Sequence, residues 1–357
     1  MKILHVCGKK DWGGGENQLL LLIKGLINDQ NEIEQSLLCP FGSDIFKRTK
    51  NQDLKIDIYC AKKEINLDPR FLYKIFSIVK KSKIDVIHAH DPDAHSLVIL
   101  AIDLFRLKTK VILHKKTIFP IKDKKYSVYK YNHSSIKYII CVSEASKNSI
   151  ISKIKSIPIK VVHDAIEIKP YSKKDALLNN SFTILNIANH TRHKNLFTLL
   201  EVANICINEK KLPFKFVQLG SGKLTPSLIE KRDALNLGNN FEFKGFIQNV
   251  EEYFFKSDAF IFTSVREGLG VSLLEAIQYK LPIVSSNAGG IPEVIENEKE
   301  GLLCNFDDVS SYVENLFKIY QSKELATTLT SNAIIKIEKK FSTTNLVQKT
   351  KKIYLSI

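Results

Sequence analysis

Two glutamates, Glu267 and Glu275, lie on either side of a Gly-Leu-Gly sequence in the stretch SVREGLGVSLLEA (264–276). A carboxylate accepts two hydrogen bonds at once, which suits the vicinal hydroxyls of a ribose or a hexose. The glycines interrupt the helical pattern, so we expect Glu267 to precede a helix and Glu275 to lie about one turn inside it. The first amides of a helix lack intrahelical partners. The pair of acids is therefore predicted to flank a row of free backbone donors at residues 268–271.

A second stretch, IANHTRHKNLFTLLEVA (187–203), places Arg192 and Lys194 in a short loop between a strand and a helix. Cations beside the N-terminus of a helix are electrostatically ill placed unless an anion is bound between them. The loop is therefore a candidate phosphate site. A solvated loop is the alternative.

Three consecutive glycines follow the first predicted strand in DWGGGENQLLLL (11–22) and open a helix. Glycines at that position let backbone amides approach a phosphate at the positive end of the helix. The spacing is not GxGxxG, and no acidic residue ends the next strand, which argues against a dinucleotide. A flexible turn without a ligand is the alternative.

His88 and His90 lie two residues apart in one predicted strand and share a face, and His95 follows in the next helix. A metal site is conceivable, but no further cysteine or acid cluster completes it in the sequence. We expect these histidines to pack at the strand end or to contact substrate, and we expect no metal.

These residues follow short apolar runs that alternate with helical patterns, which is typical of βαβ units and parallel sheets. The predicted strands of a first sheet are 2–7, 34–39, 56–60, 85–90, 110–115, 138–143 and 159–164, and those of a second are 182–188, 214–220, 241–246, 259–264, 282–286 and 301–306. Two such sets predict two doubly wound domains, with a seam near 167–180. Ligands of open parallel sheets bind beyond the carboxyl ends of the strands, and the candidate residues lie in those loops.

The net charge of +15 is unevenly distributed along the chain. Residues 1–165 hold 29 Lys and Arg against 17 Asp and Glu, a net charge of +12, and the remainder carries +3. The first half is therefore expected to meet an anionic surface or substrate, and membrane headgroups suit it. No aromatic-interleaved basic motif or recognition helix indicates nucleic acid. The six cysteines show no paired spacing and no run of apolar residues is long enough to span a bilayer, so we expect reduced thiols and a cytoplasmic chain.

The stretch REGLGVSLLEAIQYKLPIVSSNAGGIPEVI, preceded by FVQLGSG and FKGF, resembles the C-terminal domain of the family 4 retaining glycosyltransferases (glycosyl transferases group 1). Glu267 and Glu275 match the Glu–seven residues–Glu motif of that family. WGGGE, the histidine after KVIL and CVSEAS resemble landmarks of its N-terminal domain. The resemblance implies an α/β GT-B architecture, in which two Rossmann-like doubly wound domains face a central cleft. The domains would be 1–166, with a C-terminal helix at about 342–357 packing back on it, and 167–341.

The resemblance also implies roles for individual residues. Glu267, His114 and Lys194 would be the catalytic residues, with Glu267 and His114 near the donor sugar and Lys194 on the diphosphate. Glu275 would hold the ribose, and Ile247 would meet the base through its backbone. The implied donor site comprises Gly14, Gly15, Asn189, Arg192, Lys194, Gly220, Ile247, Glu267, Gly268, Leu269, Gly270, Val271 and Glu275.

The implied activity is the transfer of a hexose-type sugar from a UDP- or GDP-sugar to an envelope glycan or lipid-linked acceptor, with no metal and no cofactor beyond the donor. The expected partners are that donor, the acceptor and an anionic membrane at the inner face of the plasma membrane, with no nucleic acid. The chain departs from the family at Ala188-Asn189, where the family commonly has Gly-Arg. Arg192, three residues later, is a candidate replacement. A nucleotide-sugar-binding pseudoenzyme, a nucleotide-sugar epimerase and a basic scaffold stay open as alternatives.

Overall fold

The computed structural model of the chain describes residues 1–29, 33–169 and 181–357. The chain divides into two compact units, and each is described by itself. Unit 1 comprises Met1–Glu167 and Ser342–Ile357, and unit 2 comprises Ile168–Phe341. We predicted the boundary between the two domains at 167–180, and residues 170–180 of that stretch lie outside the described residues.

Unit 1 contains a parallel sheet of seven strands in the order β3-β2-β1-β4-β5-β6-β7. Its strands are β1 (Lys2–Val6), β2 (Glu34–Pro40), β3 (Asp57–Ala61), β4 (Val86–Ala89), β5 (Lys110–Lys115), β6 (Ile136–Cys141) and β7 (Ile159–Val161). Its helices are α1 (Gly14–Asn28), α2 (Asp44–Asn51), α3 (Pro69–Ser82), α4 (Pro92–Phe105), α5 (Lys125–Tyr131), α6 (Glu144–Asn148) and α14 (Thr343–Leu355), with the 3₁₀ turn η1 (Ile151–Lys153).

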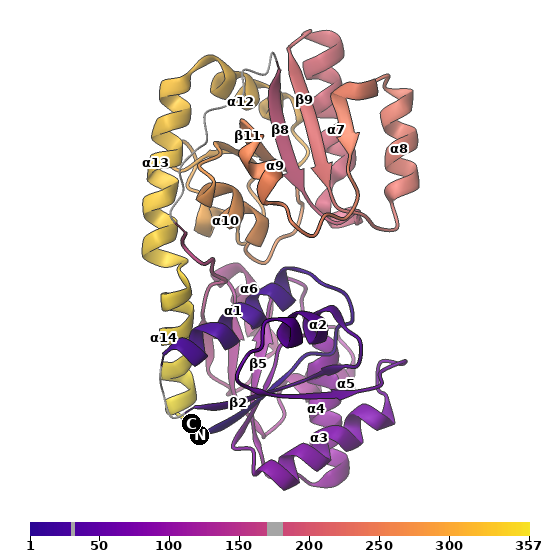
Figure 1. Cartoon of the computed structure of the whole chain (residues 1–357), viewed down its shortest axis with the longest axis vertical. Helices are drawn as coiled ribbons and strands as arrows, with labels where there is room; N and C mark the ends of the chain where they lie inside the picture. The colour runs from indigo at the N-terminus through magenta and orange to yellow at the C-terminus, as the bar shows by residue number, and fades with distance from the viewer. Residues whose placement is uncertain (30–32, 170–180) are drawn as a thin grey trace. The chain divides into compact units, whose positions relative to one another are not determined.

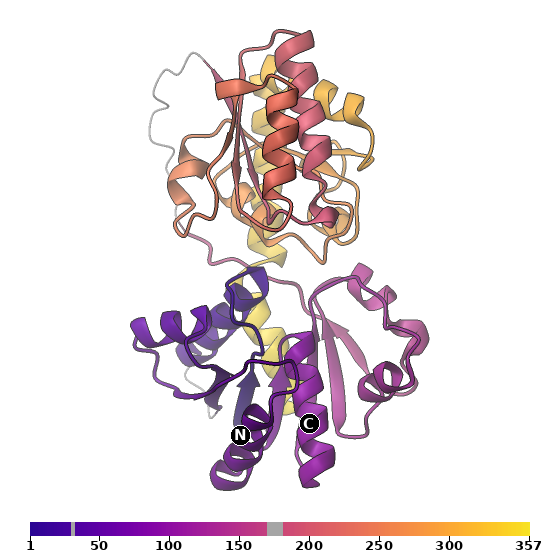
Figure 2. The same cartoon turned by 90° about the vertical axis from the view of Figure 1, so that its right-hand side faces the viewer.

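Helices cover both faces of this sheet. Side chains of α3 and α4 pack with β-strand residues such as Leu4 and Ile87 in one core cluster. On the opposite face, α1 and α14 pack with Ile3 and Val86, and Figure 1 shows these two helices side by side. Both chain termini lie at the same end of unit 1 (Figures 1 and 2). The last 16 residues of the chain therefore complete the N-terminal unit.

Unit 2 contains a parallel sheet of six strands in the order β10-β9-β8-β11-β12-β13. Its strands are β8 (Phe182–Ile187), β9 (Phe214–Leu219), β10 (Phe241–Phe243), β11 (Ala259–Phe262), β12 (Ile283–Ser286) and β13 (Leu302–Cys304). Its helices are α7 (Leu196–Asn204), α8 (Thr225–Ala234), α9 (Glu251–Phe255), α10 (Val271–Gln278), α11 (Ile291–Val294), α12 (Val309–Gln321) and α13 (Lys323–Lys340). Short turns are η2 (Arg192–Lys194), the π turn η3 (Ile205–Glu209) and η4 (Gly238–Asn240).

The two faces of the second sheet also carry helices. On one face, α7 and α12 pack with Ile184 and Ile261. On the other, Phe254 of α9 packs against Phe260 of β11, and its ring stacks on Tyr279 at the end of α10. Figure 1 shows α9 and α10 beside β11. The doubly wound architecture that we predicted is confirmed for both units.

All thirteen predicted strands are present, and most are one to three residues shorter at their carboxyl ends than predicted. The difference has a simple cause: residues such as His90, Gly220 and Ser264 adjoin apolar runs in the sequence but already belong to the loops that leave the sheet. Those loops hold the candidate site residues. Among the described residues, all six cysteines are free thiols, as expected. None of the described helices combines the length and the apolarity needed to span a bilayer.

Candidate functional sites in the two units

The candidate residues of unit 2 lie at the carboxyl edge of its sheet, at the point where the strand order reverses. The chain enters at β8, continues outward to β9 and β10, and then returns to β11 on the other side of β8. Loops that diverge at such a point leave a crevice between neighbouring strands. Lys194 follows β8 and Glu267 follows β11, so the two predicted catalytic groups of this unit flank the reversal.

The structure brings these two side chains together. Nζ of Lys194 lies 2.7 Å from Oε2 of Glu267, and both side chains are 17% exposed. The Lys194 ammonium also lies 5.0 Å from the ring centroid of Phe262 on β11. The loop is held by backbone bonds, because Val265 donates to the carbonyl of His193 and Thr263 Oγ1 donates to the carbonyl of Lys194. We did not predict this ion pair, since 73 residues separate its members.

The Gly-Leu-Gly sequence ends directly at helix α10, as predicted. Gly270 has φ 98°, a left-handed conformation that favours glycine, and no side chain caps the helix. The first amides of α10 therefore remain available to an anion at the positive end of the helix. Glu267 precedes the helix, and Glu275 is its fifth residue. Burial raises the pKa of Glu275 to about 7.

Two glycines allow backbone segments to approach each other at this edge. A Cβ on Gly289 would lie 2.2 Å from the carbonyl oxygen of Glu267, and the amide of Gly290 donates to that same oxygen. A Cβ on Gly220 would lie 2.1 Å from the carbonyl oxygen of Ala188. The Gly289-Gly290 turn therefore fixes the position of Glu267.

A buried histidine that the sequence analysis did not single out organises the loop after β8. Nδ1 of His190 lies 2.7 Å from Thr225 Oγ1, and Nε2 lies 2.7 Å from Gln218 Oε1. Its backbone amide donates to the carbonyl of Ser221. His190 thus joins the loops that follow β8 and β9, and only the fold reveals that these loops are neighbours.

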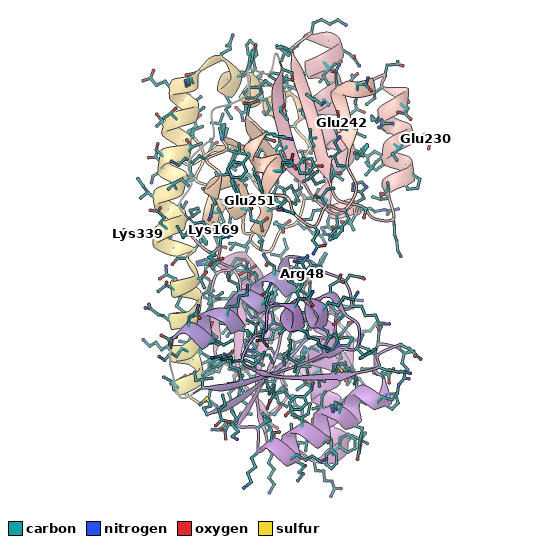
Figure 3. All side chains as sticks on the ribbon, viewed as in Figure 1. Arg48, Lys169, Glu230, Glu242, Glu251 and Lys339 are labelled. Atoms are coloured by element: carbon teal, nitrogen blue, oxygen red, sulfur yellow. The ribbon has the colours of Figure 1, made fainter. Side chains whose placement is uncertain are left out.

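The remaining predicted donor residues lie along the same edge. Asn189 and Arg192 are exposed, and Arg192 belongs to turn η2 together with Lys194. Gly220 follows β9, and its amide donates to the carbonyl of Gly245, which brings the loop of Ile247 beside it. That loop leads into α9, which carries Glu251 (Figure 3). Glu251 accepts a hydrogen bond from the hydroxyl of Tyr279 at the end of α10. The roles of these residues toward a ligand stay predictions.

Unit 1 contains a pocket of about 220 Å³ at the carboxyl edge of its own sheet. Its walls come from the loops after β1, β4 and β5, which again meet where the strand order reverses, between β1 and β4. The lining residues are Lys9, Gly15, Glu16, Ala89, His90, Asp91, Pro92, His95, Leu113, His114, Lys115, Lys116, Thr117 and Tyr131. Gly15 and His114 were predicted site residues. Gly14 is the first residue of α1.

Several groups hold the glycine loop of unit 1 in place. The Lys116 ammonium donates to the carbonyl of Gly15 at 2.6 Å. The amide of Trp12 donates to Asp44. The guanidinium of Arg48 on α2, which Figure 3 labels, lies 4.1 Å from the Trp12 ring centroid. Asp91, which caps α4, also accepts from the amide of Gly8. The loop is therefore anchored on three sides.

The charges in this pocket are modified by burial. Burial lowers the pKa of Lys115 to about 8 and raises the pKa of Glu16. His114 is buried, and desolvation with the nearby Lys116 charge lowers its pKa well below the usual value. Neither ring nitrogen of His114 has a hydrogen-bond partner among the described residues. Lys9, Lys115 and Lys116 were not predicted from the sequence, although two lysines at the end of a buried strand were a usable signal.

His88 of β4 and His90, which follows this strand, belong to a row that crosses the sheet. His5 of β1 is paired in register with His88, and Nδ1 of His5 lies 2.9 Å from Nε2 of His90. Gln35 Oε1 and the Tyr354 hydroxyl contact the outer nitrogens of His5 and His88. Nitrogens of His5, His88 and His90 lie within 4.8 Å of one another, a spacing at which imidazoles could hold a metal ion. Burial lowers the pKa of each, so all three are neutral.

Each of the two Rossmann-like units carries its candidate binding residues at the carboxyl edge of its parallel sheet. Two units of this kind define the GT-B class. Solved structures agree: the chain superposes on Anabaena Alr3699/HepE in complex with UDP and glucose with a TM-score of 0.85 and 18% identity, covering 100% of both chains. The family model Glycosyltransferase Family 4 matches residues 12–169, and Glycosyl transferases group 1 matches residues 167–336. The chain belongs to this family of glycosyltransferases.

Curated relatives carry related names. The chain is 23% identical to the Escherichia coli UDP-Gal:alpha-D-GlcNAc-diphosphoundecaprenol alpha-1,3-galactosyltransferase over 84% of this chain and 82% of that protein. It is 24% identical to the Staphylococcus aureus capsular polysaccharide biosynthesis glycosyltransferase CapH over 84% of this chain and 85% of that protein. The predicted family and fold are confirmed.

Proposed function

We propose that the protein is a retaining hexosyltransferase that uses a UDP- or GDP-sugar and glycosylates a hydroxyl of an envelope glycan or lipid-linked acceptor. The observation that carries the proposal is the edge of unit 2, where Lys194, Glu267 and the open start of α10 adjoin. The names of the E. coli and S. aureus relatives support an acceptor of this kind. In this proposal the enzyme needs no metal and works at the cytoplasmic face of the plasma membrane.

The chemistry requires stabilisation of the negative charge that develops on the departing nucleoside diphosphate. A lysine ammonium and preorganised backbone amides provide that stabilisation in a site from which water is largely excluded. Lys194 would neutralise the diphosphate, and the amides of residues 268–271 would donate to it. Glu267 would accept hydrogen bonds from sugar hydroxyls, and Glu275 from the ribose hydroxyls.

In the proposed retaining step, the bond between the anomeric carbon and the phosphate oxygen breaks as the acceptor oxygen attacks the same face. The proton of the acceptor hydroxyl passes to the departing phosphate oxygen, so the products are the glycoside and the nucleoside diphosphate. Retaining glycosidases instead use two carboxylates as nucleophile and acid/base. Glu267 is engaged by Lys194, and Glu275 lies inside a helix, which favours binding roles for both.

The first test measures release of UDP or GDP and formation of glycoside for wild type, Lys194→Ala and Glu267→Ala. Removing one charge-stabilising donor from such a site typically lowers kcat by about 10²–10³, and we expect losses of that order. Lys210→Ala, at an exposed position of unit 2, is the control and should keep wild-type rates.

Two outcomes would replace the proposal, and a third would change its stereochemistry. Binding of UDP or GDP with no turnover on lipid-linked or oligosaccharide acceptors would indicate a pseudoenzyme. The exposed Asn189, which stands where the family commonly has arginine, would then be a candidate cause of the lost activity. Release of an isomerised free sugar nucleotide would indicate an epimerase. Inverted anomeric stereochemistry in the product, determined by NMR, would leave a glycosyltransferase but remove the retaining step.

A further inference from the structure

The segment that leaves and re-enters the pocket of unit 1 combines exposed aromatic rings with lysines. Residues 118–130, which we name the docking segment, run from the end of β5 through most of α5. Phe119, Tyr126 and Tyr129 are 43%, 44% and 48% exposed. The segment also contains four lysines and one aspartate. Isolated exposed apolar side chains are common, but here three exposed rings lie within eleven residues of chain, and those of Tyr126 and Tyr129 are adjacent in space.

The backbone of the docking segment is anchored, while three of its four lysines are exposed. Ile121 is buried, and its carbonyl accepts a hydrogen bond from Lys153 at 2.9 Å. The Tyr129 hydroxyl contacts both oxygens of Asp103 on α4 at 3.0 Å. Lys122, Lys124 and Lys125 are exposed between these anchors. The docking segment is therefore held in shape before any partner arrives.

Tyrosine and lysine side chains together match the surface of an anionic bilayer. Amphipathic rings favour the level of the lipid headgroups, and each lysine near an anionic leaflet gains favourable electrostatic energy. The rings of Tyr126 and Tyr129 lie 6.3 Å apart between centroids, so they can reach one interface together. A soluble anionic glycan would also bind the lysines, so the test compares the two partners.

The docking segment adjoins the pocket in the chain and in space. Lys115, Lys116 and Thr117, which precede the segment, and Tyr131, which follows it, all line the pocket of unit 1. A membrane surface bound by residues 118–130 would therefore lie next to the wall of this pocket. The pocket presents lysine ammonium groups, which suit a phosphate-bearing headgroup.

We propose that the docking segment binds the surface of an anionic membrane and so presents the pocket of unit 1 to the phosphorylated headgroup of a membrane-held acceptor. The inference rests on the proposed function for the identity of the acceptor, but not for the membrane contact itself. It gives a defined partner to one part of the basic excess of the N-terminal half, since residues 118–130 carry a net charge of +3.

The test is co-sedimentation of the full chain with vesicles of phosphatidylcholine alone or mixed with phosphatidylglycerol, at several salt concentrations. Wild type should sediment with the anionic vesicles only. A variant with Lys122→Glu, Lys124→Glu and Lys125→Glu should lose about 100-fold or more in partition coefficient, given the gain expected per lysine. The matched control, Lys210→Glu, Lys211→Glu and Lys323→Glu, makes the same charge change at exposed positions of unit 2 and should bind like wild type.

A second variant, Phe119→Ser with Tyr126→Ser, should weaken binding at high salt, where the lysines are screened. Equal sedimentation of wild type and the lysine variant would overturn the inference, as would tighter and more salt-sensitive binding to heparin than to vesicles. Calorimetric titration with UDP in the absence of vesicles measures nucleotide binding, and so tests the proposed function separately from membrane binding. A chain that binds vesicles but no nucleotide would contradict the proposed function alone.

Discussion

Glu275 and Glu267 are eight residues apart but have different electrostatic environments. Glu267 has a lysine partner at 2.7 Å. Burial raises the pKa of Glu275 to about 7 without a charged partner contributing. The folded protein therefore bears a desolvation cost when Glu275 is ionised above neutral pH. A hydroxyl-rich ligand that donates to this carboxylate would offset that cost, which fits the ribose role that we propose.

This difference predicts how pH affects stability. The folded pKa of Glu275 is above its unfolded value, so the folded state binds the proton more tightly, and stability falls as pH rises from about 4.5 to 7. Glu275→Gln removes this cost and should raise the free energy of unfolding by up to about 3 kcal/mol at pH ~8. At pH ~4 the gain should vanish, because the carboxyl is then protonated in both states. Urea unfolding at both pH values measures the difference, and an equal effect at the two would contradict the assignment.

The same group should couple nucleotide binding to pH. If the ionised carboxylate accepts the ribose hydroxyls, UDP affinity should fall up to about tenfold per pH unit below about 7 in wild type. Calorimetric titrations between about pH 5.5 and 8 would show the slope on both sides of that pKa. The amide that Glu275→Gln introduces does not titrate, so this variant should bind more weakly in mildly alkaline buffer. It should keep only the pH dependence of the terminal phosphate of UDP, whose second pKa is about 6. A slope in the variant as steep as that of wild type would assign the pH dependence to another group.

At the scale of the elements, the strands were predictable because each is a short apolar run before a polar or glycine-rich loop. The break in SVREGLGVSLLEA was also predictable, and there Gly270 adopts a left-handed conformation that glycine favours. The ion pair of Lys194 with Glu267 could not be predicted from the sequence, because it depends on β8 and β11 being neighbours in the sheet. The contact of His88 with Tyr354, across 266 residues, depends in the same way on where the last helix packs.

The loop after β12 supports a prediction at this scale. Gly289 has φ 58°, and a Cβ added to it would lie 2.2 Å from the carbonyl oxygen of Glu267. Gly238 has φ 51°, and a Cβ added there would meet open space. Alanine costs about 1–2 kcal/mol in either left-handed position. Gly289→Ala must also displace the Glu267 backbone, so we expect about 2–4 kcal/mol of destabilisation and weaker UDP binding.

Gly238→Ala is the matched control, because it shares the backbone strain and lacks the clash. It should lose about 1 kcal/mol and bind UDP as wild type does. Urea unfolding and calorimetry on the two variants isolate the steric contribution. Similar losses of UDP affinity in both would show that the approach of residue 289 to Glu267 does not position the site.

At the scale of the whole molecule, unit 2 is one continuous stretch of chain, whereas unit 1 is completed by residues 342–357. Helix α14 buries Leu346, Val347, Ile353 and Tyr354 against unit 1. At about 1.5–3 kcal/mol for each fully buried side chain, their removal costs on the order of 6–12 kcal/mol. That equals most of the stability of an ordinary domain, which is about 5–15 kcal/mol.

A chain that ends at Phe341 should therefore lose the cooperative unfolding of unit 1 while unit 2 stays folded. Scanning calorimetry should show the loss of one transition, and sugar transfer should disappear. If unit 2 holds the donor as proposed, UDP affinity should stay within about tenfold of wild type, because Lys194, Glu267 and Glu275 are all in the intact unit. Tyr354→Phe, which removes only the hydroxyl that contacts His88 at 2.7 Å, serves as the mild comparison and should keep both transitions. Loss of UDP binding in the truncated chain would place essential donor contacts in unit 1, and retention of both transitions would contradict the role of α14.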